Sequence, residues 1–448
     1  MTHKILALII ACIITITSFA QTFKPQKNAP SLLRSDLFLL RDTIQKIHPS
    51  IYRYQSKATI DHIFDSTFAI IRDSMTVPDF YAITSFIIAS IGDGHTNCTL
   101  PNSVIKEYYS NTKVFPAMVM FINNKTFIFC CKQNIELEQA EILSIDNNSM
   151  SEIIQRLFSY IQSDGFIQSH KNWEILEKFQ LLFSIVYGEK SDYNITYKTK
   201  SGDVKSTTLH ADIIKNIFCK NPFPRPDKYL QLAYKPNNIA ILSIKTFLND
   251  FLDKTEENFS KFLDSAFNDI KIKKVQNLII DIRSNQGGND GNGKLLYSYL
   301  TAKPFKYYAS QETVNEKFSV TDHPNLALQQ PSLNNYKGKV YVLADGRSFS
   351  VSAEFSSIVK TNNRGKFIGE ECGGGYYGNT SGTEAFVTLP NTQITLRIPM
   401  VKYSMAVKNI GKKVWGIRPD YPVYLTINDI INSKDQQLDY AIKLINNL

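Results

Sequence analysis

Residues 275–288 read VQNLIIDIRSNQGG, and this stretch decides the fold. Its first nine residues are almost wholly apolar, which is typical of a strand in a parallel sheet with both faces covered. Similar apolar strands are predicted at 239–247 and 339–346. Helices are predicted around them, over 253–271, 289–303 and 350–361. Strands that alternate with helices indicate an α/β layer with a mainly parallel sheet.

The chain before residue 230 follows other patterns. Apolar residues at helical spacing predict helices from Ser35 to His48, over 58–74 and over 78–91. Short β-rich runs occupy 112–150, helical spacing returns over 151–190, and a hairpin is predicted over 193–210. Pro222, Pro224 and Pro226 mark a linker. We therefore expect a helical domain over 21–110, a small β-rich domain with helices over 111–220, and the α/β domain over 230–448.

Residues 1–20 have the composition of a secretory signal peptide. A basic start at His3 and Lys4 precedes an apolar run, and small residues precede Gln21. The run is short for a membrane anchor. A lipoprotein modified at Cys12 is the second interpretation. The segment therefore predicts export to the periplasm or cell envelope, with no membrane span after its removal.

Composition narrows the classes of function. The 448 residues are 43% hydrophobic, which indicates a folded protein, and 50 basic against 41 acidic residues leave a net charge of +9. The lysines are scattered and no nucleic-acid-binding motif is present. We therefore predict a solvated basic surface and no nucleic-acid partner.

Five cysteines follow the signal segment, and their number is odd. No spacing among them suggests zinc, so the sequence predicts no metal and no obligatory disulfide framework. Adjacent cysteines in a β-rich run are expected to point to opposite faces of a sheet. The five are Cys98, Cys130, Cys131, Cys219 and Cys372.

Two segments offer groups for acid–base and oxyanion chemistry. IGDGHT at 91–96 presents His95 in a glycine-flanked turn, and an imidazole suits a general base. Gly287 and Gly288 follow the strand that ends near Arg283, and their backbone N–H groups suit an oxyanion hole. A phosphate cradle and a plain turn are the alternatives, although no P-loop Lys-Ser/Thr pair follows.

A third segment, DGRSFSVSAEF at 345–355, is predicted to run from a strand through a tight turn into a helix. Ser350 lies at the start of that helix. One interpretation is a helix N-cap. The other is an exposed nucleophile with the Val351 N–H beside it. No G-x-S-x-G elbow surrounds Ser350, which argues against an esterase of that type.

The order of these segments resembles the S41 peptidases, the C-terminal processing and tricorn-core family. Two further segments agree, FIGEECGGG at 367–375 and GIRPDYPV at 416–423. The resemblance implies a ClpP/crotonase-like catalytic domain, a polypeptide substrate and no cofactor. AEILSIDNNSM, within 112–165, resembles part of a PDZ-like module, but the carboxylate-binding glycine loop of such modules is not evident.

The resemblance also implies roles for individual residues. Phe355 matches a phenylalanine of the family's nucleophile helix, which selects Ser350 over its neighbouring serines as the nucleophile. His95 would be the general base. Backbone N–H groups of Gly287 or Gly288 and of Val351 would form the oxyanion hole.

Two departures from the family pattern matter. Gly374 and Gly375 occupy the place of the lysine base of the Ser-Lys branch, so the Ser-His branch fits better. The glutamate that this branch carries before the closing motif is absent from 407–415. The acids that remain as candidates to orient His95 are Asp93, Glu354, Glu370 and Asp420.

The sequence therefore predicts an exported serine endopeptidase that cuts exposed or unfolded polypeptide tails through a Ser-His acyl-enzyme mechanism. The alternative is a catalytically silent peptide-binding protein with the same fold. The missing acid at 407–415 motivates that alternative.

Overall fold

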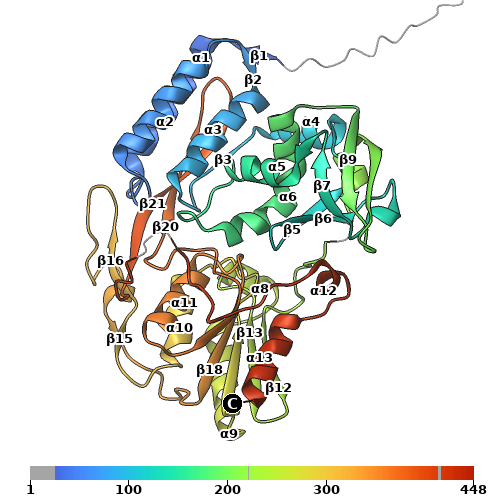
Figure 1. Cartoon of the computed structure of the whole chain (residues 1–448). Helices are drawn as coiled ribbons and strands as arrows, with labels where there is room; N and C mark the ends of the chain where they lie inside the picture. The colour runs from blue at the N-terminus through green and yellow to red at the C-terminus, as the bar shows by residue number, and fades with distance from the viewer. Residues whose placement is uncertain (1–25, 220, 412–414, 448) are drawn as a thin grey trace, which may run out of the picture.

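The computed structural model describes residues 26–219, 221–411 and 415–447. Figure 1 shows a helical unit beside a small β unit, with an α/β layer below both. The predicted signal segment 1–20 lies outside the described residues. Among the residues that are described, no helix combines the length and the apolar character needed to cross a bilayer.

The α/β layer is a six-stranded sheet in the order β12-β13-β14-β18-β19-β22. β12 pairs with β13 antiparallel, and every other neighbouring pair is parallel. The mainly parallel sheet is therefore confirmed. Its strands are β12 (Leu230–Lys235), β13 (Ile239–Ile244), β14 (Asn277–Asp281), β18 (Lys339–Ala344), β19 (Lys366–Gly369) and β22 (Tyr421–Pro422).

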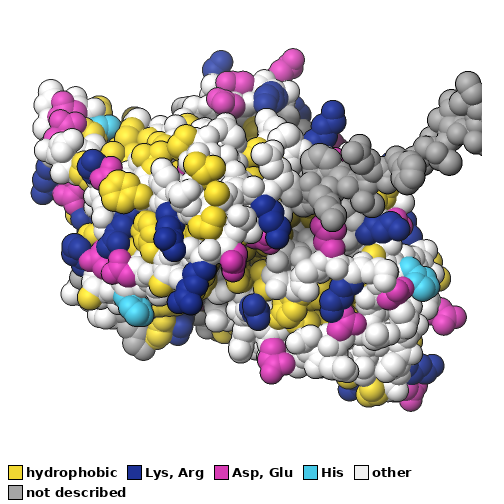
Figure 2. Space-filling view, turned by 90° about the horizontal axis from the view of Figure 1, so that it is seen from above, with side chains coloured by type: hydrophobic (Ala, Val, Ile, Leu, Met, Phe, Trp, Pro, Cys, Tyr) yellow, Lys and Arg dark blue, Asp and Glu magenta, His cyan; other side chains and the backbone are white. Residues whose placement is uncertain are grey.

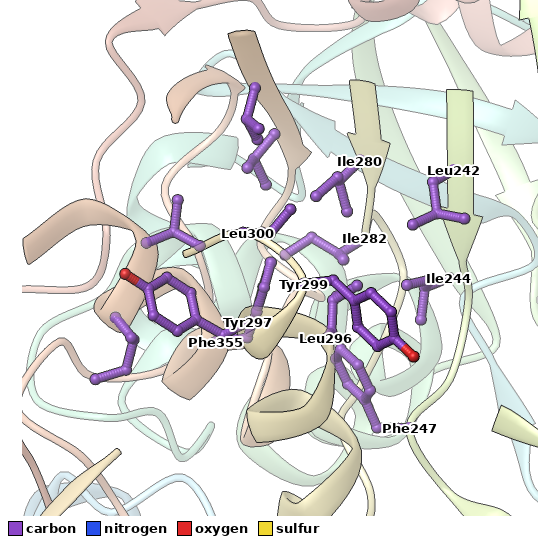
Figure 3. Packing of buried hydrophobic residues seen from close by; sticks show 14 of the residues in the cluster. Leu242, Ile244, Phe247, Ile280, Ile282, Leu296, Tyr297, Tyr299, Leu300 and Phe355 are labelled. Carbon is purple, nitrogen blue, oxygen red and sulfur yellow. The ribbon is translucent and has the colours of Figure 1, made fainter. Parts of the chain in front are cut away.

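Both faces of this sheet are covered, which explains why β14 is apolar throughout. Ile280 points into the larger core, beneath α9 (Phe259–Ile272), α10 (Asp290–Ser298) and α11 (Val351–Thr361). Ile279 points to the opposite face and packs near Ala441 of α13 (Gln436–Asn446). Figure 3 shows Leu242 and Ile280 of the strands near Leu296 of α10.

The single helix predicted over 253–271 is wrong. The chain forms α8 (Asn249–Lys254) and then α9, because Glu256 adopts a φ of 56° that ends the first helix. The Asn258 side chain accepts the N–H of Lys261 at 3.0 Å and so caps the second helix. The helix predicted over 289–303 already ends at Ser298, and the one predicted over 58–74 is α2 (Lys57–Ile70).

The small β unit contains a sheet in the order β10-β9-β7-β6-β5, in which β5 is an edge strand, and β8 (Asn148–Ser149) pairs with β7. The predicted hairpin at 193–210 is confirmed as β9 (Asp192–Lys198) and β10 (Val204–His210). The other strands are β5 (Met118–Ile122), β6 (Lys125–Cys130) and β7 (Glu141–Ile145). Helices α5 (Met150–Phe158) and α6 (Gln168–Tyr187) pack against the sheet.

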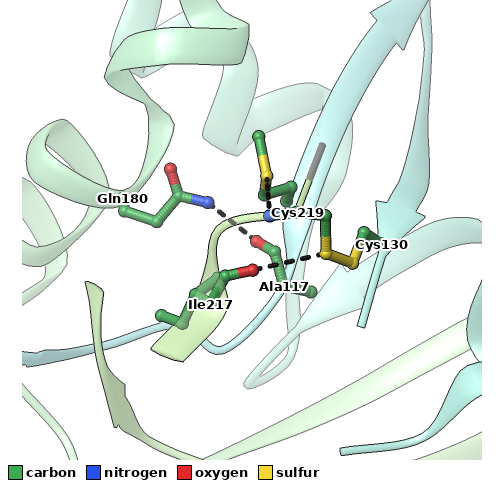
Figure 4. The surroundings of a disulfide bond; sticks show 6 residues. Ala117, Cys130, Gln180, Ile217 and Cys219 are labelled. Atoms are coloured by element: carbon green, nitrogen blue, oxygen red, sulfur yellow. Dashed lines mark hydrogen bonds between the residues drawn. A yellow bond between two sulfur atoms is a disulfide. The ribbon is translucent and has the colours of Figure 1, made fainter. Parts of the chain in front are cut away.

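A disulfide joins Cys130 at the end of β6 to Cys219, which follows α7 (Ile214–Ile217) (Figure 4). One disulfide is not a framework, and no spacing in the sequence indicated this pair. The two residues are 89 positions apart, and folding brings their Cα atoms to 6.4 Å, a distance that a disulfide can bridge. Cys131 belongs to a different core from Cys130, as the alternation along a strand requires.

The helical unit shares its core with a distant part of the chain. α1 (Pro30–Ile47) and α3 (Val77–Ile91) bury Leu37 and Ile88 in one cluster with Leu396 and Ile398. These last two residues lie on β21 (Thr395–Met405), which forms a hairpin with β20 (Thr380–Thr388). β3 (Asn97–Thr99) pairs with β21 and so anchors the segment just after His95.

Charged side chains of both signs are interspersed on the face shown in Figure 2. No single-sign patch dominates that face, which agrees with a solvated basic surface. Within the described ranges, no group of three His, Cys, Asp or Glu side chains is arranged to hold a metal ion.

Candidate active site

Ser350 lies in the turn between β18 and α11, at the carboxyl edge of the parallel sheet. Its φ of 54° and ψ of −123° form a conformation that serine rarely adopts. Such a conformation costs on the order of 1–3 kcal/mol. The Ser350 side chain makes no capping hydrogen bond to α11, so the N-cap interpretation is wrong. A strained strand-to-helix turn instead leaves the hydroxyl of the half-buried Ser350 unbonded, as in a nucleophile turn.

The neighbouring serines have structural roles. The Ser348 hydroxyl donates to the carbonyl of Ile282 at 2.9 Å, and the Ser352 hydroxyl donates to the carbonyl of Asn285 at 2.7 Å. Both bonds tie the turn to the loop that follows β14. Among the described residues the Ser350 hydroxyl has no hydrogen-bond partner, so it is the one of the three that is free to react.

The glycine pair after β14 lies directly against this turn. A Cβ atom on Gly287 would lie 2.7 Å from the Ser350 Cβ, so only glycine fits. The Gly287 N–H already donates to Asn285 Oδ1 at 2.9 Å. In the described part of the chain, the N–H groups of Gly288 and Val351 have no acceptor. These two groups therefore remain as the oxyanion-hole donors.

His95 reaches the same site from the loop between α3 and β3. Its ring stacks on Phe349, the residue before Ser350, with the ring centroids 4.6 Å apart. A Cβ atom on Gly94 would lie 2.7 Å from the Phe349 ring, so glycine is needed there for the close approach. Burial lowers the pKa of His95 to about 4, which keeps the imidazole neutral at neutral pH. The buried Nδ1 atom has no partner, and no hydrogen bond to Ser350 is formed within the described residues.

Asp93 holds the backbone of this loop. One carboxylate oxygen accepts the N–H groups of His95 and Thr96, each at 2.9 Å, and the other lies 3.6 Å from His48 Nε2. Burial opposes the charge of Asp93, but the contact with His48 outweighs it and holds the pKa of Asp93 well below its usual range. Asp93 thus orients the loop rather than the free Nδ1 of the imidazole.

Asp164, which sequence reasoning missed, joins the histidine loop to the α/β layer. One of its carboxylate oxygens accepts the Gly94 N–H at 2.8 Å, and the other accepts the Gly375 N–H at 3.0 Å. Burial and the charge of Asp93 raise the pKa of Asp164 to about 7. No motif surrounds Asp164 in the sequence, so only the fold reveals this role.

The other candidate acids serve elsewhere. Glu354 accepts the Tyr308 hydroxyl at 2.6 Å and the Asn379 side-chain amide at 2.7 Å. Glu370 accepts the Trp173 indole N–H at 3.3 Å, and Asp420 accepts the N–H of Phe367 at 2.8 Å. None of them bonds to the His95 ring among the described residues.

Two further groups near His95 were also missed. The Glu384 carboxylate acts electrostatically on the imidazole but is paired with Arg397 at 2.8 Å. His170 on α6 also stacks on Phe349, at 4.8 Å, and its Nδ1 lies 3.2 Å from the carbonyl of Gly346. The Phe349 ring thus contacts two imidazoles.

Comparison with known proteins places this geometry in a family. Residues 238–423 match the model of peptidase family S41. A stretch of 174 residues is 27% identical to the tricorn protease of Thermoplasma acidophilum, covering 39% of this chain and 14% of that protein. The chain therefore spans only a small part of that curated relative.

A likeness in fold extends over more of the chain. The structure of mature CPAF in complex with lactacystin superimposes with a TM-score of 0.64, covering 93% of this chain and 100% of that one. The two sequences are 12% identical, so this likeness concerns the fold alone.

Proposed function

Since residues 238–423 make this chain a member of peptidase family S41, a family of serine peptidases, we propose that it hydrolyses peptide bonds through Ser350 and His95. One observation carries the proposal. Ser350 is strained, has an unbonded hydroxyl and lies against Gly287, the N–H groups of Gly288 and Val351 have no acceptor among the described residues, and a neutral imidazole packs on the adjacent Phe349.

The reaction follows from these positions. The Ser350 oxygen attacks the scissile carbonyl carbon while His95 accepts the hydroxyl proton. The N–H groups of Gly288 and Val351 donate to the oxyanion that forms. His95 returns the proton to the leaving amine, which departs and leaves an acyl-enzyme. Water then attacks the ester, gives a proton to His95, and releases the acid product and the Ser350 hydroxyl.

The unpartnered Nδ1 of His95 supports one alternative. An imidazolium that no acid stabilises is a poor intermediate, and loss of the orienting group costs about 10⁴-fold in the best-studied triad. A catalytically silent peptide-binding protein with this fold is the second candidate function. The observation that favours this second function is the buried Nδ1 of His95, which has no partner among the described residues.

We propose that the small β unit docks the substrate. β5 is an edge strand, and α6 lies beside it. An extended polypeptide that adds to such an edge gains backbone hydrogen bonds, which is how PDZ-like modules hold their ligands. Exposed or unfolded polypeptide tails fit this mode because their backbone groups are unpaired.

We also propose that the protein is exported, with cleavage of the signal segment before Gln21. The Cys130–Cys219 disulfide supports this proposal, because such bonds persist in oxidising compartments. N-terminal sequencing of the protein recovered from the cell envelope tests it. An N-terminus at Gln21 is expected, and an uncleaved chain in the cytosol would contradict it.

A fluorophosphonate probe tests the peptidase proposal directly. We expect labelling of Ser350 together with hydrolysis of an unfolded protein such as reduced casein, and loss of both in Ser350→Ala. Ser357→Ala is the matched control, because within the described part of the chain this α11 hydroxyl bonds only to the carbonyl of Ala353, at 2.8 Å. Absence of both labelling and hydrolysis in the wild type, with casein still bound, would favour the silent binder.

A further inference from the structure

A cavity of about 390 Å³ lies where the small β unit meets the α/β layer. Figure 1 shows α12 (Ile427–Ile431) below β5 and β6 in this region. The cavity is lined by the last residues of edge strand β5, by one side of α6 and by the loop that follows β19. It therefore lies at the end of the β5 edge that is proposed above to dock a polypeptide.

The wall that the β19 loop contributes is acidic. Glu370 and Glu371 both line the cavity. Glu371 lies 3.6 Å from the Arg418 guanidinium, whereas no ion pair joins Glu370 to a described lysine or arginine. Burial and the charge of Asp345 raise the pKa of Glu370 to about 7. Glu370 is thus a desolvated carboxyl group that forms no ion pair with a lysine or arginine of the described residues.

The α6 wall of the cavity includes Ser169 and Asn172. The Oγ of Ser169 and the Oδ1 of Asn172 are buried and make no hydrogen bond among the described residues. A buried polar atom without a partner costs about 1–3 kcal/mol. The two oxygens and the Glu370 carboxylate can all accept hydrogen bonds, and a group with several donors would satisfy them together.

We infer that this cavity binds the basic side chain, lysine or arginine, of a polypeptide that lies along β5. The inference rests on the proposed function, since it assigns a specificity subsite to that substrate. An ammonium or guanidinium group brings three or more N–H donors and the opposite charge to Glu370. A C-terminal carboxylate, the group that PDZ-like modules usually bind, offers acceptors only and would leave these oxygens without donors.

The subsite lies within reach of the nucleophile. Glu370 and Gly374 are four residues apart, and a Cβ atom on Gly374 would lie 3.3 Å from the Ser350 nitrogen. Four residues span at most about 14 Å when fully extended. The basic residue should therefore stand within about five residues of the bond that is cut.

The test is a set of peptides in which a single lysine is moved along the chain and compared with norleucine at each position. We expect kcat/KM to rise about tenfold or more when lysine occupies one position within five residues of the cut, as a charge-assisted hydrogen bond provides. Glu370→Gln should remove this preference. Circular dichroism and urea denaturation of the variant report whether it is folded.

Glu177→Gln is the matched control. Glu177 lies on α6 one turn from Trp173, its side chain is 67% exposed, and it does not line the cavity. The preference for lysine should persist in this variant. If both variants lost the preference for lysine equally, the preference would come from the overall negative charge of this region, and the proposed subsite would be wrong.

A binding measurement separates failure of the subsite from failure of the proposed function. The Ser350→Ala variant should bind a fluorescent lysine peptide about tenfold more tightly than its norleucine counterpart. If this holds while the wild type cleaves nothing, the subsite stands and the peptidase proposal fails. Cleavage without a lysine preference at any position would overturn the subsite alone. Equal affinity for the two peptides, with loss of both on acetylation of the peptide N-terminus, would assign the cavity to an α-ammonium group and contradict the side-chain assignment.

Discussion

The nucleophile loop and the histidine loop meet at one site but are held in different ways. The loop at 345–352 is tied by the Ser348 and Ser352 hydroxyls to the segment after β14, so these two hydrogen bonds lie within one α/β layer, although Phe349 also stacks on His170 of α6. The loop at 92–96 depends on Asp93 and on Asp164, which lies beyond the first strands of the small β unit. The nucleophile is therefore set by its own layer, whereas the base is set by how separate units pack.

The largest expected effect concerns the nucleophile loop, which the α/β layer holds in place. Ser350→Ala should lower kcat/KM by at least about 10⁴-fold, because it removes the attacking oxygen and leaves the oxyanion donors in place. Turnover of an unfolded protein substrate measures this loss. Residual activity within tenfold of the wild type would assign the nucleophile to another residue.

Asp164→Asn tests the histidine loop, whose position depends on how the separate units pack. An asparagine has one acceptor oxygen, so the bond to the N–H of Gly94 or of Gly375 is lost and the histidine loop shifts. We expect kcat/KM to fall about 10²-fold, the cost of a displacement near 1 Å. Asp146→Asn, at a surface ion pair with Lys190, serves as the control. A loss of unfolding free energy in urea with unchanged kcat/KM would show that Asp164 supports the fold but does not position His95.

The pH dependence of kcat/KM is a second test of the histidine loop, because it reports the environment of His95. The base must be neutral, and burial lowers its pKa to about 4. Activity should therefore be retained as the pH falls to about 5 and be lost as it falls through 4. An acid limb near the ordinary histidine value of about 6.5 would indicate that the imidazole is solvated in the active enzyme. Circular dichroism at each pH checks that the protein stays folded.

The smallest expected effect concerns backbone strain in the nucleophile loop. Glycine accepts the φ of 54° at position 350, whereas alanine keeps the strain. Ser350→Gly should exceed Ser350→Ala in unfolding free energy by about 1 kcal/mol. Urea denaturation of the two inactive variants measures the difference. Equal stabilities would mean that the turn relaxes in solution.

Local patterns were enough to predict much of the α/β layer and part of its site. The apolar run of β14 identifies a strand buried on both faces because that property repeats along neighbouring residues. The segment around Ser350 is likewise a local strand-turn-helix signal. The split of 253–271 escaped prediction, because the helical spacing continues across a break that one residue with positive φ introduces.

What the sequence by itself determined is the alternation of strands and helices in the α/β layer, because periodicity along consecutive residues indicates it. The choice of Ser350 among its neighbouring serines came from the resemblance to the S41 peptidases. Only the tertiary structure decided the rest. Asp164 lies 70 positions from Gly94 and 211 from Gly375, and Cys130 lies 89 from Cys219. Contacts at such separations arise when packed cores bring distant segments together, so no short-range pattern in the sequence predicts them.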